Sequence, residues 1–268
     1  MPQRRPSRRR FYFGRRGEIC TFARRILQWR LTSRSRRQHQ PAATAYFTEP
    51  ILSTARETSA KNPRKNDPEG LKQRIFASAL AEFSEAGLKG ARLERIAEQA
   101  DTTKRMVVYH FKNKESLYIA VLEYAYAHIR QDEMALNLAT LPPQAAMQRL
   151  IEANFDYHVA HPAFIRLVSL ENMQRGQYAR QSEKLKLLNA SALQTLEDIL
   201  QRGKQQELFS PDMNARDVHR IISALCFHHA ANQYTFDTLF EGNRTAEEKL
   251  AYYRQMTVDV VMRYLQCK

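Results

Sequence analysis

The hydrophobic positions that follow residue 69 recur with the period of an α-helix. The first stripe consists of Ile75, Ala79, Leu80 and Phe83. Residues at i, i+4, i+5 and i+8 lie on one face, so this stripe predicts a helix over about 70–86. Gly87 follows it, and a glycine in that place is typical of a left-handed C-terminal stop.

Two short helices and one long helix are predicted next. The short ones cover about 93–99 and 103–109 and are separated by a break at residues 100–102, with Thr102 or Thr103 as the cap of the second. Asn113 is placed to cap a helix over 114–135. Two short helices joined by a three-residue turn have the lengths of a helix-turn-helix.

The rest of the chain also reads as helical. Prolines are tolerated in the first turn of a helix, and Thr, Asn and Gly mark helix ends. These signals predict five more helices, which begin or end near Pro142-Pro143, His161-Pro162, Tyr178, Gly203, Asn214, Tyr234, Thr245 and Leu265. Residues 245–248 read as a capping box. The predicted fold is all-α, with a three-helix head over 69–117 and a helical bundle over 118–268.

One face of the predicted helix-turn-helix carries residues suited to DNA. Ile96, Ala97 and Val107 are apolar or small and would lock the two helices together, so the opposite face points outward. Lys and Arg pair with guanine edges, an apolar residue meets a thymine methyl, and Tyr reaches a phosphate. We therefore expect DNA contacts from Thr103, Lys104, Arg105, Val108, Tyr109, His110, Lys112 and Lys114.

The net charge of +14 is not evidence for this interface. Residues 1–66 carry 17 basic and 3 acidic residues, whereas residues 67–268 carry 25 of each. Within residues 87–114, however, seven basic residues face three acidic ones. This local excess fits a docking face, although charge alone would also fit an ordinary solvated surface.

The segment 1–66 is Arg-rich and shows little periodicity, so it is predicted to be a disordered basic arm. Two interpretations stay open. The arm adds phosphate contacts that depend on salt, or it is not part of the native product. The second is open because no methionine occurs between Met1 and Met106, which makes the true start easy to mis-assign.

The run 75–121, taken whole and without a gap, resembles the DNA-binding head of TetR-family regulators. The matching marks are Phe83, Gly87, Ile96-Ala97, Tyr109-His110-Phe111, Lys114-Glu115 and Leu117. Three positions depart from the family pattern. Asp101 stands where a small turn residue is usual, Arg105 replaces a small residue, and Val108 replaces an aromatic one. The base preference of relatives therefore cannot be carried over.

The resemblance implies a function for the whole chain. Members are homodimers that pair through their last two helices, bind near-palindromic double-stranded DNA and hold a small-molecule effector in the body. A repressor released by its effector is expected. Two alternatives remain, namely a ligand-responsive activator and a helical adaptor that binds protein instead of DNA.

The effector pocket is expected among helices of the body. Residues 157–170 look most like the subgroup that regulates pyrimidine and heterocycle catabolism, which suggests a planar heterocyclic or aromatic metabolite. Candidate pocket residues are Phe155, His158, Phe164, Arg166, Leu167, Met173, Phe227, His228 and Tyr234. Core packing is an alternative role for each one. Arg166 would either meet an anionic group of the effector or form an ordinary salt bridge.

Other classes of function find little support. The three cysteines give neither a disulfide framework nor a metal-ligand pair, and the His158/His161 and His228/His229 pairs lack ligand geometry, so no metal and no cofactor are expected. Phosphate-loop, G-x-S-x-G and H-E-x-x-H motifs are missing, so we expect no enzyme. No run of eighteen apolar residues occurs, and a cytoplasmic location without membrane contact is expected.

Overall fold

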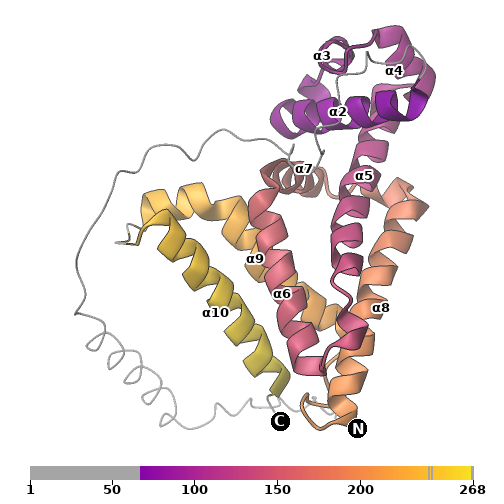
Figure 1. The fold of residues 1–268 in the computed structure, drawn as a ribbon. Coiled ribbons are helices and arrows are strands. Elements are labelled where there is room, and N and C mark those ends of the chain that lie inside the picture. Colours follow the sequence, from indigo (N-terminus) through magenta and orange to yellow (C-terminus); the bar gives the residue numbers. More distant parts are fainter. Residues whose placement is uncertain (1–66, 241, 243, 267–268) are drawn as a thin grey trace, which may run out of the picture. The chain divides into compact units, whose positions relative to one another are not determined.

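The computed structural model of the chain describes residues 67–240, 242 and 244–266. Within these residues it consists of helices joined by short loops, with no strand, and confirms the predicted all-α class (Figure 1). The predicted basic arm over 1–66 lies outside the described residues, so both interpretations of it stay as they were.

The first helix of the head is α2 (Pro68–Gly90). It begins where Asp67 accepts a 2.9 Å hydrogen bond from the backbone N–H of Gly70. Gly87 has a φ of +64° and a ψ of 175°, a non-helical conformation that favours glycine, and it kinks the helix at the place where the sequence predicts a stop. One further turn follows the kink and reaches Gly90.

The helix-turn-helix follows as α3 (Leu93–Gln99) and α4 (Lys104–Phe111). Asp101, in the turn between them, adopts a φ of +51°, which explains why small residues suit this place. Asn113 then accepts a 2.7 Å hydrogen bond from Ser116 N and caps α5 (Lys114–Ala135), as predicted. Helix α5 runs unbroken from the head into the body, so the predicted boundary at 117/118 falls inside it.

The body contains α6 (Pro143–Ala160), α7 (Pro162–Met173), α8 (Glu183–Gln205), α9 (Ala215–Leu239) and α10 (Ala246–Gln266). Short 3-10 turns at Leu138–Thr140 and Ala179–Gln181 connect α5 to α6 and α7 to α8. The capping box that opens α10 is confirmed. Thr245 N donates to Glu248 Oε2 over 2.9 Å, and Glu248 N donates to Thr245 Oγ1 over 3.2 Å.

Three predicted helix ends in the body are wrong. Helix α8 begins at Glu183 instead of near Tyr178, because Ser182 accepts the hydrogen bond from Leu185 N that caps it. It also passes through Gly203, where the ring of Phe209 lies in the space that a Cβ would fill. Gly203 is therefore a packing contact inside the helix and not a stop. Helix α9 likewise extends beyond the predicted end, to Leu239.

The buried side chains form two clusters. The upper core joins α2, α3 and α4 to α5 and α7, so the head and the adjoining part of the body share it. The lower core lies among α6, α8, α9 and α10. Helix α7 packs directly against α2, where Arg166 pairs with Glu85 over 2.7 Å and the Leu170 side chain lies beside Gly87. The head is thus connected to the body through both α5 and α7.

Candidate nucleic-acid interface and ligand cavity

Helix α2 fixes the helix-turn-helix through polar contacts. The buried carboxylate of Glu82 accepts a 3.1 Å hydrogen bond from Arg92 N at the start of α3 and lies 3.5 Å from the Arg95 guanidinium. At the other end of α3, Arg74 Nε donates to the carbonyl of Ala100 over 3.2 Å. Both ends of α3 are therefore held to one rigid helix.

The outer face of α4 presents three of the predicted contact residues together. Arg105 is exposed, Val108 is 37% exposed and Tyr109 is 77% exposed. Val107, on the opposite face, is buried against the rest of the head. The Tyr109 ring meets the neighbouring His110 ring edge-on at 5.2 Å and is otherwise open to solvent, so it is accessible to a partner.

The residues at the start of α4 have a capping and a pairing role. Thr103 Oγ1 accepts a 3.3 Å hydrogen bond from Met106 N, which confirms the predicted cap. Lys104 Nζ donates to Glu94 Oε1 over 2.7 Å, and this hydrogen bond lowers the pKa of the exposed Glu94 carboxyl. The Lys104 ammonium would have to exchange Glu94 for a DNA acceptor.

Three further predicted contacts lie at the end of α4 and the start of α5. Lys112 is exposed and has a φ of +66°. His110 is half-buried, and its Nε2 has no hydrogen-bond partner among the described residues. Lys114 points back into the head, where Nζ donates to the carbonyls of Ala91 over 3.1 Å and Lys89 over 3.3 Å. Its ammonium joins α5 to the end of α2.

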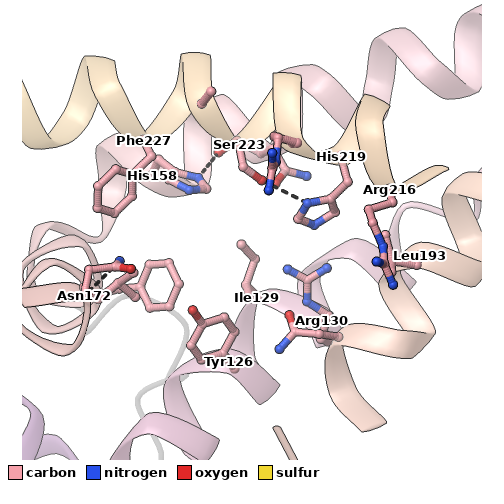
Figure 2. A pocket seen from close by; sticks show the side chains of 16 residues that line it. Tyr126, Ile129, Arg130, His158, Asn172, Leu193, Arg216, His219, Ser223 and Phe227 are labelled. Atoms are coloured by element: carbon pink, nitrogen blue, oxygen red, sulfur yellow. Dashed lines mark hydrogen bonds between the residues drawn. The ribbon is translucent and has the colours of Figure 1, made fainter. Parts of the chain in front are cut away.

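A cavity of about 600 Å³ lies in the body (Figure 2). Five helices line it, each through positions at helical spacing. The lining residues are Tyr126, Ile129 and Arg130 of α5, Asn154 and His158 of α6, Phe164, Val168 and Asn172 of α7, Asn189 and Leu193 of α8, and Arg216, His219, Arg220, Ser223, Ala224 and Phe227 of α9. The volume is within the usual range for a small-molecule site.

Three of the nine predicted pocket residues line this cavity, namely His158, Phe164 and Phe227. The other six lie elsewhere because they occupy other faces of the same helices. Phe155 and Leu167 are buried in the two cores, Arg166 pairs with Glu85 at the surface, and Met173, His228 and Tyr234 are exposed. Of the two roles left open for Arg166, the structure shows the ordinary salt bridge.

Sequence reasoning missed the basic groups of the cavity. Arg130 begins the polar run Arg130-Gln131-Asp132-Glu133 of α5. Arg216, Arg220, Ser223 and Phe227 form a stripe along α9. The spacing of that stripe was a usable signal, because residues at i, i+4, i+7 and i+11 share a face. Which helices the stripe would oppose was not readable from the sequence.

The buried Arg130 organises the polar side of the cavity. Its Nη1 lies 2.6 Å from Glu133 Oε2, and Glu133 Oε1 accepts a 3.1 Å hydrogen bond from Asn154 Nδ2. Burial raises the pKa of the Glu133 carboxyl, while Arg130 acts in the opposite direction. Burial also lowers the pKa values of His158 and His219, and the nearby Arg130 charge lowers them further. Both imidazoles are thus held toward the neutral form.

The last two helices carry apolar residues on two faces. Inner residues such as Ile222, Val258 and Val261 pack into the lower core. Eight other large apolar residues between positions 234 and 264 are exposed to solvent, namely Tyr234, Phe236, Leu239, Phe240, Leu250, Tyr252, Val260 and Tyr264. The helices therefore cover their own core and still leave an apolar outer surface, which is typical of a protein interface.

In the described part of the chain, no three His, Cys, Asp or Glu side chains are grouped so that they could hold a metal ion. None of its helices is both long and apolar enough to cross a membrane.

Two family models match the two parts of the chain. Residues 75–121 match the model described as bacterial regulatory proteins of the tetR family, and residues 143–261 match the one described as the tetracyclin repressor-like C-terminal domain. The resemblance predicted from residues 75–121 is confirmed over that same range.

Relatives over larger parts of the chain agree. The HTH-type transcriptional repressor NicS of Pseudomonas putida is 30% identical over 210 residues, which are 78% of this chain and 99% of NicS. The HTH-type transcriptional regulator RutR of Escherichia coli is 35% identical over 100 residues, 37% of this chain and 47% of RutR. The solved transcriptional regulator SCO4942 of Streptomyces coelicolor superimposes with a TM-score of 0.55 at 25% identity, over 72% of this chain and 97% of that one. All three are named as transcriptional regulators or repressors.

Proposed function

Because the chain belongs to the TetR family of bacterial regulatory proteins, we propose that it is a transcriptional repressor that leaves its operator when a small molecule enters the cavity of the body. The observation that carries this proposal is one continuous helix. Only two residues separate the end of the DNA-reading α4 from the start of α5, and α5 supplies Tyr126, Ile129 and Arg130 to the cavity wall.

The exposed face of α4 is proposed to enter the major groove. Arg105, Val108 and Tyr109 would read bases and phosphates there, while Thr103, Lys104, His110 and Lys112 would contact the flanking backbone. Lys114 is the exception among the predicted contacts, because its ammonium already donates to two carbonyls of the head. Its proposed role is to position α5 against α2.

A homodimer through the outer faces of α9 and α10 is proposed to carry two heads. Those faces expose the eight large apolar side chains named above, and a second copy of the same surface would bury them around a two-fold axis. Two heads held about 34–36 Å apart match successive major grooves of a near-palindrome. The operator, and therefore the working protein, would lie in the cytoplasm.

Release follows from the two connections between cavity and head. A ligand that contacts α5 and α7 more favourably in one arrangement of the body shifts the protein toward that arrangement. Both helices would pass the shift to α2, α3 and α4, and the heads would lose the spacing of the operator. The aromatic walls provided by Tyr126, Phe164 and Phe227 support a planar heterocyclic or aromatic effector.

The test begins with selection of duplexes from a random pool by the purified full chain. An enriched near-palindrome is expected, and the protein should bind it as a dimer in sedimentation. On that duplex Arg105→Ala should lose roughly 1–3 kcal/mol of binding free energy. Arg149→Ala, an exposed arginine on α6, is the matched control and should change nothing. A pool without enrichment would refute the repressor and favour the adaptor.

A further inference from the structure

The cavity has a cationic side and an aromatic side. Figure 2 shows Arg130 of α5 and His219 of α9 pointing toward one another, with Arg216 beside them, while Phe227 lies at the opposite side. Among the described residues that line the cavity, three are arginines and two are histidines, and none is acidic. A ligand that fills it must therefore satisfy a positive region and an apolar region together.

Arg130 leaves one donor unused in this region. The residue is only 7% exposed, and its Nη1 is taken by Glu133 at 2.6 Å. Its Nε is buried and has no hydrogen-bond partner among the described residues. Buried donors of a charged group are almost always paired, so an unpaired one on a residue that lines a cavity is a candidate partner for an acceptor that enters it.

The positive charge also exceeds its local compensation. Glu133 offsets the charge of Arg130, but it is the only carboxylate that pairs with this wall within the described chain. Arg216 and Arg220 are exposed at the rim, and neither forms an ion pair with a described residue. The guanidinium groups of two arginines therefore remain uncompensated, which would attract an anion into the cavity.

We infer that the effector is a small aromatic carboxylate, whose carboxylate accepts from Arg130 Nε while its ring lies among Tyr126, Phe164 and Phe227. This inference rests on the proposed function, because it names the ligand class of the same cavity. A planar guanidinium matches a planar carboxylate, and hydrogen bonds between two charged groups are about twice as strong as neutral ones. Arg130 thus takes the role that sequence reasoning left open for Arg166.

Proton uptake should accompany this binding. A bound anion favours the charged forms of His158 and His219, whose pKa values burial and Arg130 hold down in the empty cavity. Helices α7 and α8 line the cavity with no ionisable side chain. The other ionisable groups that face these imidazoles are Tyr126, Arg130 and Glu133 of α5, His161 of α6, and Arg216 and Arg220 of α9. Binding should therefore tighten as the pH falls from about 8 to 6.

The experiment compares aromatic acids of one and two rings with their primary amides, beginning with benzoate and benzamide. Thermal shift and release of the selected duplex are measured with the full chain. Acids should stabilise the protein and release DNA, whereas amides should do neither. Calorimetry in buffers of different ionisation enthalpy should show proton uptake for the acids.

Variants then test Arg130 itself. Arg130→Met combined with Glu133→Gln removes both charges, so no lone charge is left buried, and it should weaken acid binding roughly 10- to 100-fold. If that variant does not unfold cooperatively, Arg130→Lys keeps the charge without the Nε donor and should weaken binding as well. Arg166→Met and Arg149→Met are surface controls that should bind the acids as the parent does.

The outcomes separate the two proposals. Amides that release DNA as well as the acids do would overturn the anion inference and leave the repressor standing. Acid binding that ignores the loss of Arg130 would overturn the assigned contact. If neither the acids nor the amides change the thermal stability or the DNA binding, both the cavity as effector site and this inference are overturned. The selection of duplexes would still test DNA binding by the head.

Discussion

Lys114→Met separates a structural role of this lysine from a DNA contact. The ammonium donates to Ala91 O over 3.1 Å and to Lys89 O over 3.3 Å, and the side chain is half-buried. A hydrogen bond from a buried charged group contributes roughly 1.5–3 kcal/mol. Because one of these two is long and exposed, we expect a total loss of about 1–2 kcal/mol. Methionine keeps the apolar stem, so packing should change little.

Lys112→Met is the matched comparison, since the Lys112 side chain is exposed and its ammonium donates to no described side chain or carbonyl. For a domain of this size, each kcal/mol shifts the midpoint of thermal unfolding by about 2–4 °C. Lys114→Met should therefore lower the midpoint by several degrees, whereas Lys112→Met should not. In titrations of the operator with salt, Lys112→Met should reduce the slope of log K against log salt by about 0.9 for each head.

The opposite result for Lys114→Met would refute a structural role of this lysine. An unchanged midpoint for Lys114→Met, together with a salt slope reduced as much as by Lys112→Met, would mean that its ammonium leaves the two carbonyls and neutralises a phosphate. The thermal midpoint and the salt slope are measured on the same preparation of each variant. A general loss of fold would lower the midpoint, so it cannot produce an unchanged midpoint together with a reduced salt slope.

Three other changes test the body. Gly203→Ala should destabilise by roughly 1–3 kcal/mol, because the new Cβ overlaps the Phe209 ring, and chemical denaturation measures this. Thr245→Ala should cost about 1 kcal/mol through loss of the capping box with Glu248, and an effect below a few tenths would contradict the cap. Burial raises the pKa of the Cys226 thiol to about 12, so iodoacetamide at pH 8 should alkylate it only in denaturant, as peptide mass spectrometry can show.

The head was predictable because local signals and tertiary contacts agree there. Thr103 and Asn113 cap the helices that their side chains predict, and Val107 packs inward as its spacing requires. Local sequence signals gave a wrong helix end where a contact with a residue outside the helix determines the structure. Gly203 carries the usual mark of a helix end, yet the ring of Phe209 lies against it and the helix continues.

The cavity was predictable only in part, for a related reason. Phe164 and Phe227 attract attention as aromatic residues, and both line it. His228, one position further along α9, points about 100° away and is exposed. The pairing of Arg130 with Glu133 follows from neighbouring turns of one helix, but its exposure to a cavity depends on how α6 and α9 cross in front of it. How two helices cross cannot be predicted from the sequence of either helix alone.

The unbroken course of α5 has a mechanical consequence. From Lys114 to Arg130 the helix rises about 24 Å, and its sequence contains no glycine or proline at which it could bend. A tilt of about 5° with its pivot at Arg130 would move the start of the helix by about 2 Å, by the geometry of a rod of that length. A sub-ångström adjustment beside a ligand is thereby magnified at the DNA. The same stiffness lets selection change the cavity and the reading helix independently, since the rod transmits displacement whatever chemistry lies at either end.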